Sequence, residues 1–208
     1  METKALPRDF EMPCAGVRRF RETSRERLLS VDEAARLWGA IEGLPEESHL
    51  ARDVLLTLAL TGARRSEIMK LRWSEVDFGR AMIVIADGKT GRRVIHLPPD
   101  AIEILERQRR SNAHEWVFAS KGGKPIDNIY RTWGRVTKAA GLSDFRPHDM
   151  RHAMASTMAA QGHGLLTIGK ALGHKRAETT NRYAHLVDAA AAHAVAGAAL
   201  AISGKAAR

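Results

Sequence analysis

The sequence predicts an α+β fold that is mainly helical and carries a small antiparallel sheet. Apolar residues recur at helical spacing along most of the chain. Two β-prone runs, residues 81–86 and 93–97, flank Asp87-Gly88-Lys89-Thr90-Gly91, whose composition is typical of a hairpin turn. With 208 residues, 44% of them hydrophobic, the chain can bury one substantial core, or one domain with an appendage.

The charge of the chain indicates its kind of partner. The formal net charge of +9 favours a polyanion, most commonly a nucleic-acid backbone, although charge alone does not separate DNA from RNA or an anionic membrane. Cys14 is the single cysteine, which excludes a disulfide framework and a Cys-rich zinc site. Residues 189–202 are apolar but alanine-rich and interrupted by His193, so we expect a poor membrane span. With no signal peptide visible at Met1, these features predict a soluble, cytoplasmic protein without a membrane partner.

The N-terminal part of the chain divides into an arm and predicted helices. Residues 1–27 contain prolines, a glycine and several arginines without apolar periodicity, which is typical of a linker or extended arm. Ser30 and Glu33 have the spacing of a capping box and predict the start of the first helix. Residues 50–60 predict a more uniformly apolar, central helix, and residues 66–73 predict a further one.

Beyond the predicted hairpin the pattern is again mostly helical. Helices are expected over residues 99–110, 127–140, 147 to the stop at 162, 165–172, and 187–202. Residues 116–118 predict a short strand, and residues 121–125 predict a basic loop. The last helix has a largely apolar surface that no local segment covers, so we expect it to fold back or to dock on a neighbour.

The stretch from residue 146 to residue 183 concentrates cationic and proton-carrying side chains. His148 and Arg151 are three residues apart and share a helix face. Gly173 ends the next predicted helix with His174 just beyond it, and Tyr183 follows nine residues later. A lone histidine or tyrosine is more often structural. The whole set, however, suits an anionic substrate and a tyrosine nucleophile.

Three motifs in this stretch resemble the C-terminal signature of tyrosine recombinases, the phage integrases. They are His-Asp-Met-Arg-His at 148–152, Leu-Gly-His at 172–174 and Arg-Tyr-Ala-His at 182–185. The family pattern also has an arginine in a Thr-Gly-x-Arg-x-x-Glu setting and a lysine on a hairpin. Arg64, in the motif at 61–67, and Lys89 match these two positions.

The resemblance implies a site and a reaction. The implied catalytic residues are Arg64, Lys89, His148, Arg151, His174 and Tyr183. Tyr183 would attack a DNA phosphodiester and form a 3′-phosphotyrosine, with His148 assisting loss of the phenol proton. Arg64, Arg151 and His174 would stabilise the phosphate, and Lys89 would protonate the departing 5′ oxygen. No metal, ATP or other cofactor is expected, and both cis and trans delivery of the tyrosine stay open.

The resemblance also implies a domain organisation. Residues 28–187 are expected to form the catalytic domain, after a linker or arm at 1–27. Residues 188–208 are expected to form a C-terminal helix or tail that docks on another protomer. Family members usually carry a helical DNA-clamping domain before such a linker, so the chain is expected to be either a fragment or a short version. The expected partners are double-stranded DNA and further copies of the chain in a tetrameric synapse, with integration or excision of a mobile element as the outcome.

The same residues allow other interpretations of the sequence. His148 and His152 could bind zinc with His174 or His185, but the zinc protease motif His-Glu-x-x-His is not matched. A phosphate-binding loop at Gly88-Lys89-Thr90 is rejected because Ile83 stands where the first glycine should be. A catalytically silent DNA-binding regulator and a type IB topoisomerase-like activity remain alternatives.

Overall fold

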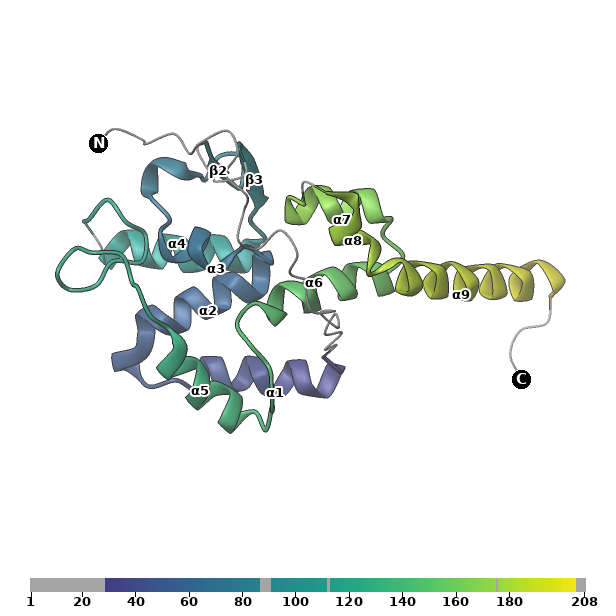
Figure 1. Ribbon diagram of the computed structural model, residues 1–208, viewed down its shortest axis with the longest axis horizontal. Coiled ribbons are helices and arrows are strands. Elements are labelled where there is room, and N and C mark those ends of the chain that lie inside the picture. The colour runs from purple at the N-terminus through teal and green to yellow at the C-terminus, as the bar shows by residue number, and fades with distance from the viewer. Residues whose placement is uncertain (1–28, 87–90, 112, 175, 205–208) are drawn as a thin grey trace, which may run out of the picture.

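The predicted helices assemble into a mainly helical body with a small sheet at one side (Figure 1). The computed structural model describes residues 29–86, 91–111, 113–174 and 176–204. The α-helices in this part of the chain are α1 (Val31–Glu42), α2 (His49–Thr61), α3 (Arg65–Met69), α4 (Pro99–Ser111), α5 (Tyr130–Ala139), α6 (Asp149–Ala160), α7 (Leu165–Leu172), α8 (Ala177–Asn181) and α9 (Ala184–Ser203). Two 3₁₀ turns, η1 (Glu46–Ser48) and η2 (Trp73–Glu75), lie between them. The α+β prediction is confirmed.

The sheet is antiparallel, in the order β1-β2-β3. Its strands are β1 (Val76–Asp77), β2 (Met82–Ile85) and β3 (Arg93–His96). The register between β2 and β3 pairs Ile83 with Ile95, and both side chains are buried. This pairing confirms the predicted hairpin, whereas the two-residue β1 is too short to be visible in the sequence. The hairpin tip with Lys89 lies outside the described residues.

The turn after α2 brings distant helices together. Gly62 ends α2 in the left-handed conformation, with φ of 59°. A Cβ at this position would lie 2.8 Å from Leu172 Cδ2 and 3.0 Å from Met154 Cγ. Position 62 therefore requires a glycine, both because its φ is positive and because α6 and α7 approach it closely. The same turn places Arg64 beside the end of α7.

Two apolar clusters share α6 as a common wall. The larger cluster contains buried residues of α1 to α5 and of the sheet, with Met150 of α6 at its edge. The smaller cluster contains Ala155, Ala159, Ile168, Leu172 and Tyr183. Figure 1 shows α6 running between the main body and the group formed by α7, α8 and the start of α9. Polar residues near the N-terminal end of α6 therefore lie where the two clusters meet.

Three predicted elements differ in the structure because backbone groups pair elsewhere. The helix predicted over 66–73 ends at Met69, since residues 71–73 pair with residues 115–117; Val117 N donates to Leu71 O at 2.8 Å. The strand predicted over 116–118 is wrong, because only isolated bridges form there. The helix predicted from 127 begins at Tyr130, whose N–H donates to Asn128 Oδ1 at 2.8 Å.

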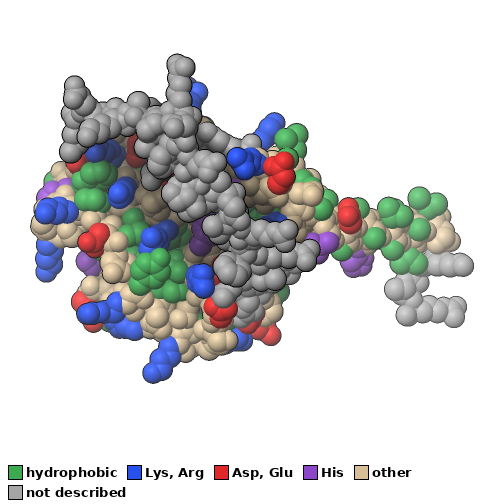
Figure 2. Space-filling view, in the orientation of Figure 1, with side chains coloured by type: hydrophobic (Ala, Val, Ile, Leu, Met, Phe, Trp, Pro, Cys, Tyr) green, Lys and Arg blue, Asp and Glu red, His purple; other side chains and the backbone are tan. Residues whose placement is uncertain are grey.

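The C-terminal helix α9 is longer than predicted and projects from the body (Figure 1). It begins directly after Tyr183, and Leu186 and Val187 pack against the smaller cluster. None of its residues is buried, and Figure 2 shows hydrophobic side chains along the projecting part. With 20 residues and a mean hydropathy of 1.6, α9 is long and apolar enough to cross a membrane. The sequence analysis considered only residues 189–202 and expected a poor membrane span. One such helix is weak support for a membrane span.

The packing at Gly62 predicts an asymmetry between two glycine substitutions. Gly62→Ala should lower the free energy of unfolding by more than about 2 kcal/mol, through backbone strain and a clash with Leu172. Gly134→Ala is the matched control, since Gly134 lies inside α5 with nothing within 4 Å of an added Cβ. It should raise the free energy of unfolding by about 0.5–1 kcal/mol. Urea titration measures both, and a Gly62→Ala protein as stable as the parent would refute the close approach.

Candidate active site

Arg64 is held at the start of α3 by two separate parts of the chain. Its backbone N–H donates to Glu67 Oε2 at 2.9 Å, and its Nη1 donates to Glu67 Oε1 at 2.7 Å. Its Nη2 donates to the carbonyl of Gly173 at 3.3 Å. The Arg64 side chain is 30% exposed, so its guanidinium is fixed in direction while the side chain is still open to a ligand.

Arg151 connects the ends of two helices from within α6. It is only 5% exposed, and its Nη1 donates to the carbonyl of Gly62 at 2.8 Å. Its Nη2 donates to the carbonyl of Leu172. Burial, followed by the charges of Arg93 and Arg64, lowers the pKa of Arg151 to about 10, so the group stays protonated at neutral pH.

The two predicted arginines therefore converge on the last carbonyls of α7. Arg151 binds the carbonyl of Leu172, and Arg64 binds that of Gly173. Carbonyls at a helix C-terminus carry partial negative charge, which favours cations there. This convergence is tertiary, because 87 residues of sequence separate the two arginines.

A third arginine, which the sequence analysis missed, joins the site from β3. Arg93 is buried, and its Nη1 donates to Glu67 Oε1 at 2.9 Å. Burial lowers its pKa, Glu67 opposes this shift, and Arg64 adds to it. Among the described residues, its Nε and Nη2 are buried without a hydrogen-bond partner. One carboxylate oxygen thus serves two guanidiniums.

Gly173 makes room for this third arginine. It ends α7 in the left-handed conformation, with φ of 63°, and a Cβ there would lie 2.8 Å from Arg93 Nε. Two residues in the sequence were related to the role of Arg93: the glutamate of the Thr-Gly-x-Arg-x-x-Glu motif and the glycine before His174. Neither signal shows that an arginine of the hairpin lies between them.

His174 lies just after α7, and α8 fixes its ring. Its Nδ1 is 2.7 Å from Thr180 Oγ1, a hydrogen-bond distance, and Thr180 is itself buried. Burial, followed by the charges of Arg151, Arg64 and Arg93, lowers the pKa of His174 to about 4. At neutral pH the imidazole is uncharged, and its unused nitrogen can exchange hydrogen bonds with a ligand.

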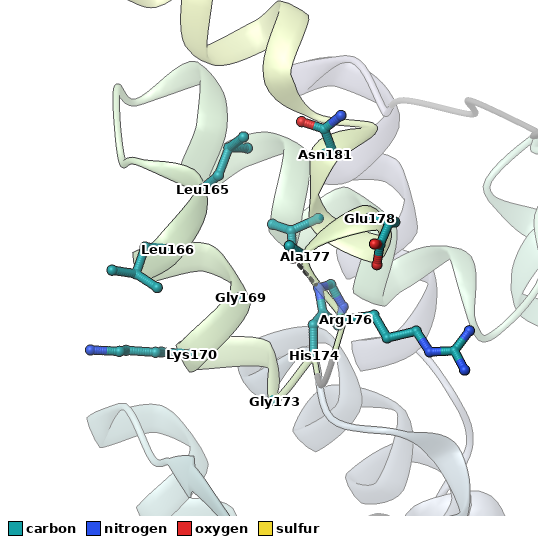
Figure 3. A pocket seen from close by; sticks show the side chains of 11 residues that line it. Leu165, Leu166, Gly169, Lys170, Gly173, His174, Arg176, Ala177, Glu178 and Asn181 are labelled. Carbon is teal, nitrogen blue, oxygen red and sulfur yellow. Dashed lines mark hydrogen bonds between the residues drawn. The ribbon is translucent and has the colours of Figure 1, made fainter.

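Two grooves meet at His174. The first, of about 590 Å³, lies between α7 and α8; Figure 3 shows His174, Lys170 and Arg176 along it, with Leu165 and Leu166 at its other end. The second, of about 290 Å³, lies between β3 and α7, and its lining includes Arg92, Arg93, His96 and Lys170. The approaches to His174 from β3 and from α8 are therefore both lined by cationic side chains.

Tyr183 lies at the junction of α8 and α9, with its ring in the smaller apolar cluster. It is 5% exposed, and its Oη is 2.6 Å from His152 Nδ1. Burial raises its pKa, whereas Arg182, by charge and hydrogen bonding, and then Arg151 act in the opposite direction. The phenol is thus protonated at neutral pH and lies beside the cationic cluster.

His148 forms the N-terminal end of α6, one turn before His152. The two rings meet edge to face, with centroids 5.1 Å apart. Burial, and next the charge of Arg151, lowers the pKa of His148. The nitrogen at hydrogen-bond distance from the phenol belongs to His152, a residue that the sequence analysis considered only as a zinc ligand.

The described part of the chain thus brings five of the six predicted site residues into one region. Arg64, Arg151 and His174 surround the end of α7, and His148 and Tyr183 lie beside them on either side of His152. The position of Lys89 is not described. Among residues 29–86, 91–111, 113–174 and 176–204, no group of three or more His, Cys, Asp or Glu side chains is arranged to hold a metal ion.

This fold and site define a class of protein: a mainly helical domain that collects guanidiniums and imidazoles around one buried tyrosine. A model of the phage integrase family matches residues 27–190, which is most of the chain. The chain therefore belongs to the phage integrase family.

Individual relatives and solved structures are similar to the chain over most of its length. The integrase of Salmonella phage P22 is 32% identical over 181 residues, which cover 79% of this chain and 45% of that protein. The crystal structure of XerA recombinase superposes with a TM-score of 0.69 at 27% identity, covering 85% of this chain and 66% of that one. The Tn1549 transposon integrase, solved in complex with circular intermediate DNA, superposes with a TM-score of 0.67 at 20% identity, covering 78% and 63%. The chain spans about half the length of the curated relatives that it matches.

The carboxylate that Arg64 and Arg93 share predicts that loss of Glu67 destabilises the protein more than loss of Arg93. Glu67→Gln should lower the free energy of unfolding by about 3 kcal/mol, because Arg64 and Arg93 would then face each other without a counter-charge. Arg93→Met should change it by less than about 1 kcal/mol, because Glu67 keeps Arg64 and two buried nitrogens without partners are removed. Urea unfolding measures both variants. Equal losses for the two would contradict this account of the cluster.

Proposed function

We propose that this chain is the catalytic part of a site-specific DNA recombinase, an integrase that breaks and rejoins DNA through a 3′-phosphotyrosine. Its proposed catalytic residues are Arg64, Lys89, His148, Arg151, His174 and Tyr183. The observation that carries the proposal is the convergence of Arg64 and Arg151 on the end of α7 beside Tyr183, in a chain of the phage integrase family. The proposed outcome is integration or excision of a mobile element. The similarity of the chain to the integrase of phage P22 supports this outcome.

The chemistry follows from the charges around the phosphate. Attack on a phosphodiester adds negative charge to its nonbridging oxygens, and fixed guanidiniums stabilise that charge in a site that needs no reorganisation. Arg64 and Arg151 would supply these forks of donors, and His174 a further contact. Tyr183 Oη would bond to phosphorus while the bond to the 5′ oxygen breaks, with Lys89 giving that oxygen its proton. A histidine would take the phenol proton, and the family pattern assigns His148 to this role.

The intermediate would store the energy of the broken bond, so rejoining needs no ATP. Charge stabilisation by side chains also makes a metal ion unnecessary in this scheme. A catalytically silent regulator of the same fold would keep the helices without needing the tyrosine. A type IB topoisomerase-like activity would use the same covalent step without exchanging partners.

Double-stranded DNA is the proposed partner. The net charge of +9 supports it, and Figure 2 shows lysine and arginine side chains spread over the body. Phosphate contacts of this kind would give binding that weakens steeply with salt. The proposed location is the cytoplasm, because the proposed substrate is DNA.

We further propose that residues 28–187 act as the catalytic unit, with 1–27 as a linker or arm, and that residues 188–208 dock on a neighbouring protomer in a tetrameric synapse. The projecting part of α9 supports this role, because Val195 and Ile202 are 70% and 87% exposed. Since α9 is continuous from Ala184, docking would act directly on the segment that carries Tyr183. Delivery of Tyr183 in cis, within its own protomer, fits its burial against α6.

The covalent step gives the main test. A nicked duplex containing the element's crossover sequence should form a protein–DNA adduct that survives denaturing electrophoresis. Tyr183→Phe should abolish the adduct, because the nucleophilic oxygen is lost, with a fall of at least about 10³-fold in cleavage rate. Tyr130→Phe is the matched control, since the chain has two tyrosines and Tyr130 is exposed on α5.

Three outcomes would contradict the proposal. An adduct that persists in Tyr183→Phe would assign the chemistry to another residue. Cleavage that EDTA abolishes and zinc restores would favour the histidine-cluster alternative. Relaxation of supercoiled DNA without exchange between two crossover sites would favour the topoisomerase-like activity.

The proposed docking of α9 predicts a defect in assembly alone. Val195→Lys with Ile202→Lys should leave the fold of the free chain intact and remove higher-order complexes on DNA, because lysines cannot be buried against a protomer without large cost. Val31→Lys, at a position of α1 that is 86% exposed, is the matched control. Mass photometry with crossover-site DNA measures the assemblies. Unchanged assembly would contradict the proposal that α9 docks on a neighbouring protomer. Flotation with lipid vesicles that depends on α9 would also contradict it.

A further inference from the structure

We propose that His152, and not His148, accepts the phenol proton of Tyr183 during cleavage. This inference rests on the proposed function and assigns one step of it to a residue outside the family-derived set. The contact that carries it is the 2.6 Å distance between Tyr183 Oη and His152 Nδ1. A general base must lie within hydrogen-bond reach of the proton that it removes, and His152 meets this condition before any DNA is bound.

The surroundings of His152 keep its ring uncharged, and an uncharged ring can accept a proton. Its ring stands between the ring of His148, 5.1 Å away, and that of Tyr183, 6.3 Å away between centroids. Burial, then the charges of His148 and Arg182, lower its pKa to about 4; Asp149 opposes this shift, and Arg151 adds to it. The imidazole is therefore neutral at neutral pH. A neutral ring with its hydrogen on Nε2 leaves Nδ1 free to accept the phenol hydrogen.

The position of His152 is fixed by its helix. It follows Arg151 directly in α6, and Ser156 Oγ donates to its carbonyl at 2.9 Å. His148 is one turn earlier and meets the edge of the His152 ring. His148 would thus influence the phenol through His152, as a positioning residue that sets the orientation and basicity of its neighbour.

DNA binding should make His152 a stronger base. After burial and the charge of His148, the charges of Arg182 and Arg151 lower its pKa, and both arginines belong to the cationic side of the site. A phosphate bound there would offset these charges and raise the affinity of Nδ1 for a proton. The same burial that raises the phenol pKa makes an acceptor necessary, because an unassisted phenol would lose its proton too rarely.

The step balances as follows. The Tyr183 O–H bond breaks, its electron pair forms the bond to phosphorus, and the proton moves to His152 Nδ1. The bond from phosphorus to the 5′ oxygen breaks with its electron pair, and that oxygen takes a proton from the Lys89 ammonium. In rejoining, an incoming 5′ hydroxyl attacks phosphorus and gives its proton to Lys89, while the departing phenolate takes its proton back from His152.

A substrate with a 5′-bridging sulfur distinguishes the residue that acts as acid from the residue that acts as base, because a thiolate leaving group needs no proton. Single-turnover cleavage of nicked DNA would be measured with oxygen and sulfur at this position. Lys89→Ala should be slow with oxygen and close to the parent rate with sulfur. His152→Ala should be slower than the parent by about 10²-fold or more with both substrates. Added imidazole should restore part of its rate, and His148→Ala should lose less than His152→Ala.

A second variant separates proton transfer from positioning. His152→Gln keeps a side chain that can accept the phenol hydrogen bond but cannot take up the proton. It should remain as slow as His152→Ala, and its far-ultraviolet circular dichroism should match that of the parent. A His152→Gln protein that cleaves within about threefold of the parent rate would overturn the proton-acceptor role.

Other outcomes also overturn the proposal. If His152→Ala cleaves faster than the parent, the contact restrains Tyr183 and does not assist it. If sulfur restores His152→Ala to the parent rate, His152 serves the leaving group. These results are distinct from failure of the proposed function, in which the parent chain forms no adduct or Tyr183→Phe still forms one.

Discussion

The site depends on two carbonyls at the C-terminal end of α7, those of its last residue and of the glycine that caps it. Leu172 O accepts from Arg151 and Gly173 O accepts from Arg64, so one helix end fixes two guanidiniums from distant parts of the sequence. Gly62 makes this possible, because any larger residue there would push α2 away from Leu172. The arrangement also has an electrostatic consequence. Like charges are held together in a partly buried place, which is unfavourable until an anion arrives.

Glu67 reduces the repulsion among the clustered arginines in the free protein. Its Oε1 accepts from both Arg64 and Arg93, at 2.7 Å and 2.9 Å. A single carboxylate compensates only part of the charge of these two arginines and Arg151. A bound phosphate would supply the remainder and would meet donors already aimed by α7 and α3. Burial first, and neighbouring positive charge second, lower the pKa values of His152 and His174, so both imidazoles are neutral and able to act in proton transfer and hydrogen bonding.

Much of this could be predicted from the sequence, since short-range signals determine it. The capping box at Ser30, the hairpin formed by β2 and β3 and the end of α2 at Gly62 are local features. The end of α3 at Met69 could not be predicted in this way, because it depends on pairing with residues 115–117 far along the chain. For the site, motif spacing indicated which residues to consider. The role of Arg93 was invisible, because an arginine in a strand resembles a surface residue until the fold places it under Gly173.

In the proposed reaction Arg64 and Arg151 stabilise the negative charge of a DNA phosphate, and a neutral phosphate analogue shows whether they do. A methylphosphonate at the cleaved position removes one nonbridging oxygen charge and with it the need for one guanidinium. Cleavage rates of the parent, Arg64→Ala and Arg151→Ala would be compared on phosphate and methylphosphonate DNA. The account predicts that each arginine variant loses at least about 10²-fold on phosphate DNA, and much less on the methylphosphonate. Equal losses on both substrates would contradict it.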